Sequence, residues 1–427
     1  MRRYSLLLLV LASCAPGPPV RTALQGTLAD LKRDIQSAQQ AGKLDRDRVV
    51  KLARAVGERE LTSAQGTNGA LRVRSLRSCA RPLRSAMEHR AQGDDDVAAE
   101  LTLILLETHA ADRTALLNRH ARSPSGAWRA VAARAAVRPI DTDLRQSFYV
   151  DPDERVRRAA LGTAREVHSE GELEALLEAA RVDPDPQSQS LAARAAGAVG
   201  GERAVLALKD LWTRADDTLR IAIVDGWSEH ASFVAGGARE LAQVAPTGGM
   251  AGVSASYALA RSGGAESAAA NARLRQNILD GTDDEKRLAL NVAPLDPETE
   301  AAIVKASHDA SMELRVVALT RLGAIPERRE DSIRALRELA NVRAGSDAEL
   351  RARDAAVSAL ADAGDTSVAA TLLKNLHGTE PQVRGRAARA LTSLGDYTNA
   401  ASVLADDDAN LRTDLACMIL ARDAAQR

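Results

Sequence analysis

Apolar residues recur with a fixed spacing over the C-terminal two thirds of the chain. In the segment TEPQVRGRAARALTSLGD, Val383, Leu391 and Leu394 lie eight and three residues apart and are followed by Gly395. Eight residues cover a little more than two helical turns, so these positions share one helical face. The spacing predicts a helix with one buried face that ends at a glycine.

The same register repeats at intervals of 28 to 38 residues. The positions equivalent to Val383 are Val156, Ser188, Leu219, Ala251, Lys286, Leu314, Ala352, Val383 and Leu411. The residues eight places further on are Ala164, Ala196, Trp227, Leu259, Pro294, Leu322, Leu360, Leu391 and Ile419. Pro294 departs from the apolar pattern, so we expect an irregular unit near Asn291–Asp296. Intervals of this length fit two short helices and two turns, which predicts an array of stacked helical hairpins.

Turn residues support this division. An acidic residue precedes proline at four turns, namely Asp151-Pro152, Asp183-Pro184, Asp296-Pro297 and Glu380-Pro381. A carboxylate there can cap the first helical amides, and proline at the first helical position loses no hydrogen bond. Glycines stand where the first helix of each pair should end, at Gly200, Gly263, Gly323, Gly364 and Gly395. We expect them to adopt the left-handed conformation that terminates a helix.

The pattern resembles the HEAT-repeat family, and in particular its bacterial phycobilisome-lyase-like subtype. The residues that carry the resemblance are Val156-Arg157, Leu314-Arg315, Ala352-Arg353, Val383-Arg384 and Leu411-Arg412. It covers the last two thirds of the chain, with a weaker copy around Ala127–Ile140. It implies an all-α fold, a right-handed α-solenoid of stacked helical hairpins of the HEAT or armadillo type. Aromatic residues make up only 2% of the chain, and no segment alternates like a half-buried strand.

The resemblance also implies that each arginine meets an acidic residue of a neighbouring turn. Asp309, Asp347 and Asp408 precede their arginines at suitable spacing. The alternative is that these are ordinary helix caps and solvated arginines.

The first residues read as an export signal. Met1–Ser5 is short and basic, and Leu6–Ala12 is apolar but too short to span a bilayer. The end of the run, Leu11-Ala12-Ser13-Cys14, resembles the lipobox of bacterial lipoproteins, which implies acylation of Cys14 after removal of residues 1–13. A simple signal peptide is the alternative. Residues 14–21 form a proline-rich tether. Ala15 after the cysteine favours the outer over the inner membrane by the same resemblance.

Residues 22–122 are predicted to form an N-terminal helical region, which is either a cap or a set of degenerate repeats. The predicted HEAT-repeat array follows over residues 123–427. Its expected helices are Thr22–Gly42, Asp45–Ala64, Ala70–Arg90 and Asp94–His120. A stripe of Leu24, Leu28, Leu31 and Ile35 should be the buried face of the first one.

Charge argues against a nucleic-acid partner. Loss of Arg2 and Arg3 with the signal leaves 55 basic residues against 58 acidic ones, so there is no positive excess to neutralise phosphates. Two cysteines remain after acylation of Cys14. Export would permit a disulfide between Cys79 and Cys417. In a linear stack, however, they would lie many tens of ångströms apart, so we expect buried free thiols.

Few residues suggest a specific site. Arg77, Arg81 and Arg84 share a predicted helical face that could bind an acidic partner or a lipid headgroup, although a solvated face explains them equally simply. His109, Asp112 and His120 fit no compact ligand motif, so we expect no metal and no cofactor.

The motifs of enzymes are missing from the sequence. None of the seven histidines precedes glutamate, unlike the iron-binding HEAT-like hydroxylases. There is no Gly-x-Ser-x-Gly elbow and no phosphate-binding Gly-Lys-Ser/Thr loop. A lyase role conflicts with export, so we expect a protein that is not an enzyme.

Aromatic residues concentrate between Trp128 and Tyr257. Trp227 falls on the buried register, whereas Trp212, which ends a second helix, is the candidate for contacting a partner. The leading hypothesis is a membrane-anchored, non-catalytic scaffold that binds a protein or peptide along a concave surface of second helices. The alternative is a structural component or assembly factor of an envelope complex.

Overall fold

The computed structural model describes residues 18–108 and 112–426, and within these ranges all regular secondary structure is helical. The helices form antiparallel pairs that stack side by side, as expected of an all-α solenoid. The predicted fold class is confirmed. Cys14 and the expected signal lie outside the described residues. None of the described helices is both long enough and apolar enough to cross a bilayer.

The chain divides into two compact units. Unit 1 comprises residues 1–110 together with 360–427, and unit 2 comprises residues 111–359. The chain therefore leaves unit 1 at Ala110 and returns to it at Leu360. This division cuts through the predicted 123–427 array.

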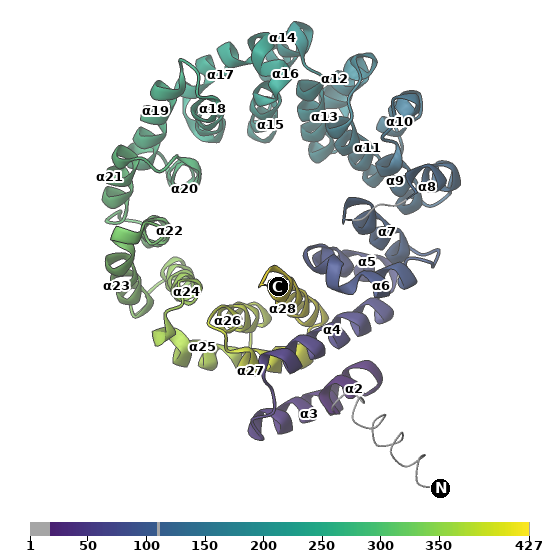
Figure 1. Ribbon diagram of the computed structural model, residues 1–427. Helices are drawn as coiled ribbons and strands as arrows, with labels where there is room; N and C mark the ends of the chain where they lie inside the picture. The colour runs from purple at the N-terminus through teal and green to yellow at the C-terminus, as the bar shows by residue number, and fades with distance from the viewer. Residues whose placement is uncertain (1–17, 109–111, 427) are drawn as a thin grey trace. The chain divides into compact units, whose positions relative to one another are not determined.

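Unit 2 consists of hairpins whose two helices alternate along the chain (Figure 1). The first helices are α9 (Gly126–Ala135), α11 (Glu154–Glu166), α13 (Pro186–Val199), α15 (Asp217–Ser228), α18 (Gly249–Ser262), α20 (Asp283–Val292) and α22 (Met312–Leu322). The second helices are α10 (Thr142–Tyr149), α12 (Leu173–Val182), α14 (Gly201–Trp212), α17 (Ala238–Val244), α19 (Ser267–Asp280), α21 (Pro297–Ala306) and α23 (Arg329–Ala340). Helix α8 (Arg113–His120) precedes them, the short α16 (His230–Ser232) precedes α17, and α24 (Asp347–Asp362) follows α23.

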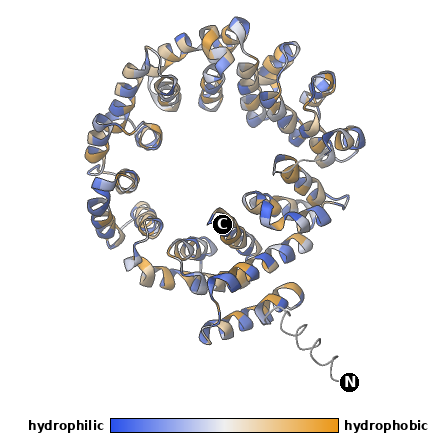
Figure 2. Ribbon diagram, viewed as in Figure 1, coloured by the Kyte–Doolittle hydropathy of each residue, from blue (hydrophilic) through white to orange (hydrophobic). Residues whose placement is uncertain are grey.

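The repeat register derived from the sequence is confirmed. Its anchor residues lie in the first turn of their helix, most often as the third residue, as Val156 does in α11. The exception is Ala352, the sixth residue of α24. The residues eight places further on are buried at every repeat except Pro294. Pro294 lies beyond the end of α20 at Val292, where proline interrupts no helical hydrogen bond. The helices show mixed hydropathy along their length (Figure 2), and most of their buried residues are apolar.

The helix ends match the expected turn chemistry in part. Gly200, Gly263, Gly364 and Gly395 have positive φ angles, as predicted, whereas Gly323 has a φ of −62° and stays right-handed. Asp296 caps α21 by accepting from the Thr299 amide, with Pro297 as the first helical residue.

Two of the predicted acidic caps are wrong. Asp151 and Asp183 do not cap their helices, because Asp153 and Asp185 two residues later occupy the capping positions. This frees the earlier carboxylates for another contact, described below. Glu380 stands at the cap position of α26 without a side-chain hydrogen bond.

The first helices approach one another more closely than the second helices do. A Cβ added at Gly197 of α13 would lie 2.3 Å from the Gly226 Cα of α15, so these helices touch at their backbones. Helix α12, in contrast, contacts α10 and α14 sparsely. Close packing on one side curves unit 2 so that its first helices line the inner side of the arc (Figure 1). The expectation that second helices line the concave surface is therefore wrong.

Unit 1 joins the two ends of the chain. It holds α2 (Pro18–Gln25), α3 (Leu28–Gln40), α4 (Arg46–Ser63), α5 (Gly66–Val73), a 3₁₀ turn (Arg74–Cys79), α6 (Ala80–Arg90), α7 (Asp96–Thr108), α25 (Ala369–Leu376), α26 (Pro381–Ser393), α27 (Tyr397–Ala400) and α28 (Ala409–Gln426). Helix α28 packs on α4, on α26 and on the 3₁₀ turn. The predicted helix Thr22–Gly42 is broken at Gly26–Thr27, which leaves Leu24 exposed while Leu31 and Ile35 are buried.

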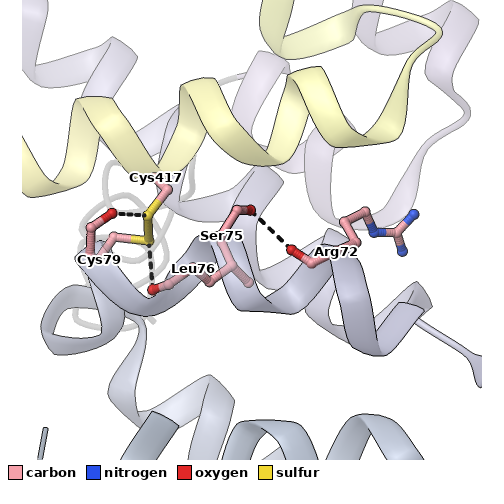
Figure 3. The surroundings of a disulfide bond; sticks show 6 residues. Arg72, Ser75, Leu76, Cys79 and Cys417 are labelled. Carbon is pink, nitrogen blue, oxygen red and sulfur yellow. Dashed lines mark hydrogen bonds between the residues drawn. A yellow bond between two sulfur atoms is a disulfide. The ribbon is translucent and has the colours of Figure 1, made fainter. Parts of the chain in front are cut away.

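A disulfide links Cys79 to Cys417, with 5.1 Å between their Cα atoms (Figure 3). The prediction of two distant free thiols is wrong. It assumed that both cysteines belong to opposite ends of one linear stack, whereas α28 packs directly on the 3₁₀ turn that carries Cys79. Both sulfurs are buried.

Candidate functional site

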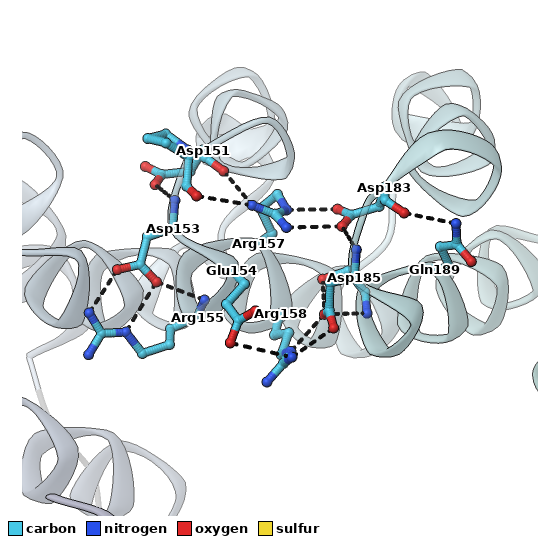
Figure 4. A network of polar contacts seen from close by, with 11 residues as sticks. Asp151, Asp153, Glu154, Arg155, Arg157, Arg158, Asp183, Asp185 and Gln189 are labelled. Atoms are coloured by element: carbon cyan, nitrogen blue, oxygen red, sulfur yellow. Dashed lines mark hydrogen bonds and ion pairs between the residues drawn. The ribbon is translucent and has the colours of Figure 1, made fainter. Parts of the chain in front are cut away.

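Arg157, the fourth residue of α11, joins two successive hairpins (Figure 4). Its Nε and Nη2 donate to the two oxygens of Asp183 at 2.7 and 3.0 Å. Its Nη1 donates backward to the carbonyls of Asp151 and Pro152. Asp183 also accepts from the amide of Asp185, the cap residue of α13. The arginine thus connects the loop before its own helix to the loop before the next one.

This arrangement, here called a rung, recurs. A rung is a cation at the fourth position of a first helix, bound to an aspartate two residues before the cap of the next first helix. The other rungs are Arg129–Asp151, Lys286–Asp309 and Arg384–Asp406, with bonds of 2.7 to 2.9 Å. In each, the aspartate also accepts the amide two residues ahead, which fixes its orientation.

The last rung uses a residue from the front of the chain. Arg412 is the fourth residue of α28. Its Nη1 donates to the carbonyls of Asp406 and Asp407, as in other rungs, and its Nε donates to Glu60 of α4 at 2.9 Å. Within unit 1, α4 therefore occupies the position of the next hairpin.

The resemblance implies contacts between arginines and acidic residues of neighbouring turns, and such contacts are present. The acid, however, precedes the next first helix rather than the arginine's own helix. Asp309 binds Lys286 of the preceding repeat rather than Arg315. Asp408 accepts amides at the start of α28, so it is a helix cap. Asp347 lies in the first turn of α24.

Two arginines at the rung position have no aspartate from the next hairpin, although Arg220 pairs with Asp217 of its own helix at 3.5 Å. For Arg220 and Arg315, the residue two places before the next cap is Pro246 and Ala344, respectively. Both Nε atoms are buried and lack a hydrogen-bond partner within the described part of the chain. A buried unsatisfied donor costs about 1–3 kcal/mol, so these two arginines differ from those that form rungs.

Trp212 lies beside one of these exceptions. Arg220 stands over its ring, with 5.5 Å from the guanidinium carbon to the ring centroid. The ring also contacts Trp227 at a centroid distance of 5.6 Å and is half-buried. Trp227 is fully buried and donates to the Val205 carbonyl, so its predicted core role is confirmed. The Trp212 ring is a platform that partly compensates Arg220 by a cation–π contact.

The predicted basic face is interrupted. Arg77 belongs to the 3₁₀ turn, whereas Arg81 and Arg84 belong to α6. Arg77 pairs with Glu107 at 3.0 Å and Arg84 pairs with Glu88 at 2.6 Å. Arg81 is exposed. Neighbouring carboxylates thus neutralise two of the three charges.

A buried ionic cluster was not foreseen from the sequence. Arg145 of α10 donates from Nε and Nη2 to Glu172 at 2.7 and 2.6 Å, and Tyr149 donates to the same carboxylate. Arg145 and Glu172 are 1% and 0% exposed. Burial and the adjacent Glu172 carboxylate raise the pKa of Tyr149. The cluster joins α10 to the start of α12, and no local motif announces it because its members lie 27 residues apart.

The histidines considered as metal ligands have other contacts. Asp112 caps α8 by accepting from the Ala115 amide. His120 stacks on Trp128 at a centroid distance of 4.2 Å, and burial, together with Arg119, lowers its pKa. His109 lies outside the described residues. Within those residues, no group of three potential ligands is close enough to hold a metal ion.

Comparison with known proteins agrees with the fold. Residues 142–226 match the family described as HEAT repeats. These residues span α10 to α15 and include the Arg157–Asp183 rung. The chain is therefore a helical-repeat protein that carries HEAT repeats.

Two solved structures are similar to the chain. One is human deoxyhypusine hydroxylase in complex with glycerol, with 15% identity, a TM-score of 0.25, and coverage of 70% of this chain and 98% of that one. The other is an engineered protein, with 16% identity, a TM-score of 0.25, and coverage of 88% and 98%. No curated protein matches the chain.

Proposed function

We propose that this protein is a lipid-anchored bacterial scaffold, of the phycobilisome-lyase-like HEAT subtype, that binds a protein or peptide partner without catalysing a reaction. The arrangement of Met1–Cys14 supports export and acylation of Cys14. Several acyl chains on one residue give stable anchoring. Ala15 favours the outer membrane as the destination.

The Cys79–Cys417 disulfide supports an exported location. Disulfides form and persist in oxidising compartments and are rare in the cytosol of mesophiles. A protein that passes through the envelope would meet such conditions.

The observation that carries the scaffold role is the series of rungs. Ion pairs fix several hairpins to the next ones, so these parts of the array present a preorganised surface. The buried charges of Arg145, Glu172 and Arg157 are bound to one another or to loop carbonyls. Their use in holding helices together favours a binding role over a catalytic one.

The inner side of the arc in unit 2 is the proposed partner surface. The first helices α11, α13 and α15 carry exposed or half-exposed pairs such as Arg194–Asp225 and Arg165–Glu229. Such polar side chains suit a reversible protein contact better than a purely apolar layer does.

Fractionation of cells that express the full chain tests the tether. The wild-type protein should sediment with membranes, Cys14→Ser should become soluble, and Ser13→Ala should remain bound because alanine is equally small. Equal membrane retention of Cys14→Ser would contradict the tether. Cross-linking in native membranes followed by affinity capture tests the scaffold, which predicts a discrete partner. Recovery of the protein without any cross-linked partner would contradict the scaffold.

A further inference from the structure

Arg315 lines a groove in unit 2 and stands at a rung position that has no aspartate partner. The groove lies between α21, α22 and α23 and has a volume of about 630 Å³. Its apolar wall consists of Val304, Leu319, Leu322, Ala335 and Leu339. The size suits a few amino-acid side chains rather than one water molecule.

The guanidinium of Arg315 is the one cation of this groove that the rung pattern leaves unused. Two other arginines on the groove are already paired, Arg328 with Glu300 at 2.7 Å and Arg334 with Asp331 at 2.8 Å. No hydrogen bond or ion pair joins Arg315 to any residue in the described ranges, and its Nε is buried. Glu313 is the nearest acid by sequence, but it pairs with Arg287 and Arg351. Asp309 interacts electrostatically with Arg315, but its hydrogen bond is to Lys286.

The rungs show which type of group binds an arginine at this helical position. At the same helical position, Arg157 and Arg384 each bind both oxygens of an aspartate. Arg315 has the same place in α22, but the aspartate is replaced by Ala344. A planar guanidinium with an open fork is matched best by a planar carboxylate.

We propose that Arg315 binds an aspartate or glutamate side chain of a partner peptide, so that the partner supplies the missing acid of the rung. The apolar wall would take the aliphatic side chains beside that acid. This inference rests on the proposed scaffold function and names the chemistry of one contact. Glu338 also lines the groove and would repel an incoming carboxylate, so it limits the affinity.

Calorimetric titration of the full chain in detergent with two synthetic peptides tests this contact. The probe is acetyl-Leu-Asp-Leu-amide, and its matched reference is acetyl-Leu-Asn-Leu-amide, which has the same shape without the charge. Isovalerate serves as a free carboxylate, and distinguishes recognition of any small acid from recognition of a peptide. Wild-type protein should bind the Asp peptide at least about tenfold more tightly than the Asn peptide. It should bind isovalerate more weakly than the Asp peptide.

Variants assign the preference to Arg315. Arg315→Gln should abolish the preference, whereas Arg220→Gln, at the other rung position that lacks an aspartate from the next hairpin and lies outside the groove, should retain it. Glu338→Gln should strengthen binding of the Asp peptide. Ala344→Asp should supply the acid within the chain, raise the melting temperature and weaken binding of the Asp peptide. The melting temperature of Arg315→Gln reports its folding, and it should not fall, because the variant removes an unsatisfied donor.

Three results would overturn the inference: no binding of the Asp peptide, equal affinity for both peptides, or an unchanged preference in Arg315→Gln. Isovalerate binding as tightly as the peptide would overturn the assignment to a peptide. Partner capture from native membranes separates the two claims. If a partner is captured but the peptides are not distinguished, the scaffold stands and this contact fails. If the Asp peptide binds through Arg315 but no partner is captured, the contact stands and the scaffold fails.

Discussion

Arg412 and Glu60 form an ion pair of 2.8 Å although 352 residues separate them in the chain. Both side chains are largely buried, at 11% and 2% exposure. The pair completes the rung of α28 with a residue of α4, so within unit 1 helix α4 takes the place that the next hairpin takes at the other rungs. Such an arrangement covers a face of α28 that would otherwise be open.

Removal of the acid from this pair should destabilise unit 1. Glu60→Gln leaves the Arg412 charge buried without a counterion, and we expect a loss of about 3 kcal/mol. Glu58→Gln is the control, because Glu58 lies two residues away and forms no such buried pair. Urea unfolding of the full chain measures both. Equal midpoints for the two variants would show that the pair does not hold the termini together.

Loss of a rung inside unit 2 should lower the free energy of unfolding by at least a similar amount. Arg157→Gln removes a bidentate pair whose partners are 9% and 3% exposed, so we expect a loss of about 3–5 kcal/mol. Arg155→Gln changes a neighbouring arginine in a more exposed pair and should cost less than about 1 kcal/mol. The same unfolding measurement applies. Comparable losses of unfolding free energy in both variants would mean that burial of the rung does not increase its contribution to stability.

The stability of the rungs should depend on acidic pH. Lys286 donates to Asp309 and lowers the pKa of that carboxyl. Burial raises the pKa of Asp406, but the hydrogen bonds and charge of Arg384 and the amide of Asp408 together lower it further than burial raises it. A carboxyl whose pKa is lower in the folded state stabilises the fold above its unfolded pKa of about 4. This contribution is lost as the pH falls through the lower, folded value.

The contribution of these aspartates to the melting temperature should therefore stay constant between about pH 7 and 5 and be lost below about pH 4, whereas the lowered pKa of His120 adds a separate decline below about pH 6.5. Asp406→Asn should reduce the acid-dependent part, whereas Asp407→Asn, at the exposed neighbour, should leave it unchanged. A wild-type melting temperature that rises on acidification would contradict the paired state of these aspartates.

Substitutions at the backbone contact between α13 and α15 test whether close approach of the first helices requires glycine there. Gly197→Ala places a Cβ 2.3 Å from the Gly226 Cα, so the helices must separate, at a cost of about 1–3 kcal/mol. Gly162→Ala is the matched control, because the added Cβ at this helical position in α11 meets no atom within 4 Å. It should stabilise by about 0.5–1 kcal/mol. Destabilisation by both variants would mean that close approach at Gly197 is not the cause.

The sequence predicts the hairpins well because each depends on local signals. The register that contains Val383 and Leu391 needs only periodicity, and the glycine ends need only the freedom of glycine at positive φ. The sequence indicates that these arginines bind acidic residues, but it does not identify the partner, because the partner depends on which loop lies beside each arginine. Asp183 looks like a helix cap in sequence, and only the packing of α11 against α13 shows that it is the acid of a rung.

Contacts between distant segments lie beyond such reasoning. The pairing of Cys79 with Cys417 and of Arg412 with Glu60 requires knowing that α28 packs on α4, and no periodic signal encodes that contact. A linear stack is the simplest extrapolation from repeats, and it placed these residues far apart. The absence of a rung aspartate opposite Arg220 and Arg315, by contrast, becomes visible in the sequence once the spacing of a rung is known.

The most direct test of this account is a peptide map of the full chain, digested without reduction after its free thiols have been alkylated. Packing of the last helix on the first ones predicts a single cross-linked species that joins the peptides of Cys79 and Cys417, and reduction should lower the melting temperature through a loss of about 2–5 kcal/mol. Recovery of both peptides separately, each alkylated before reduction, would contradict the joining of the two termini.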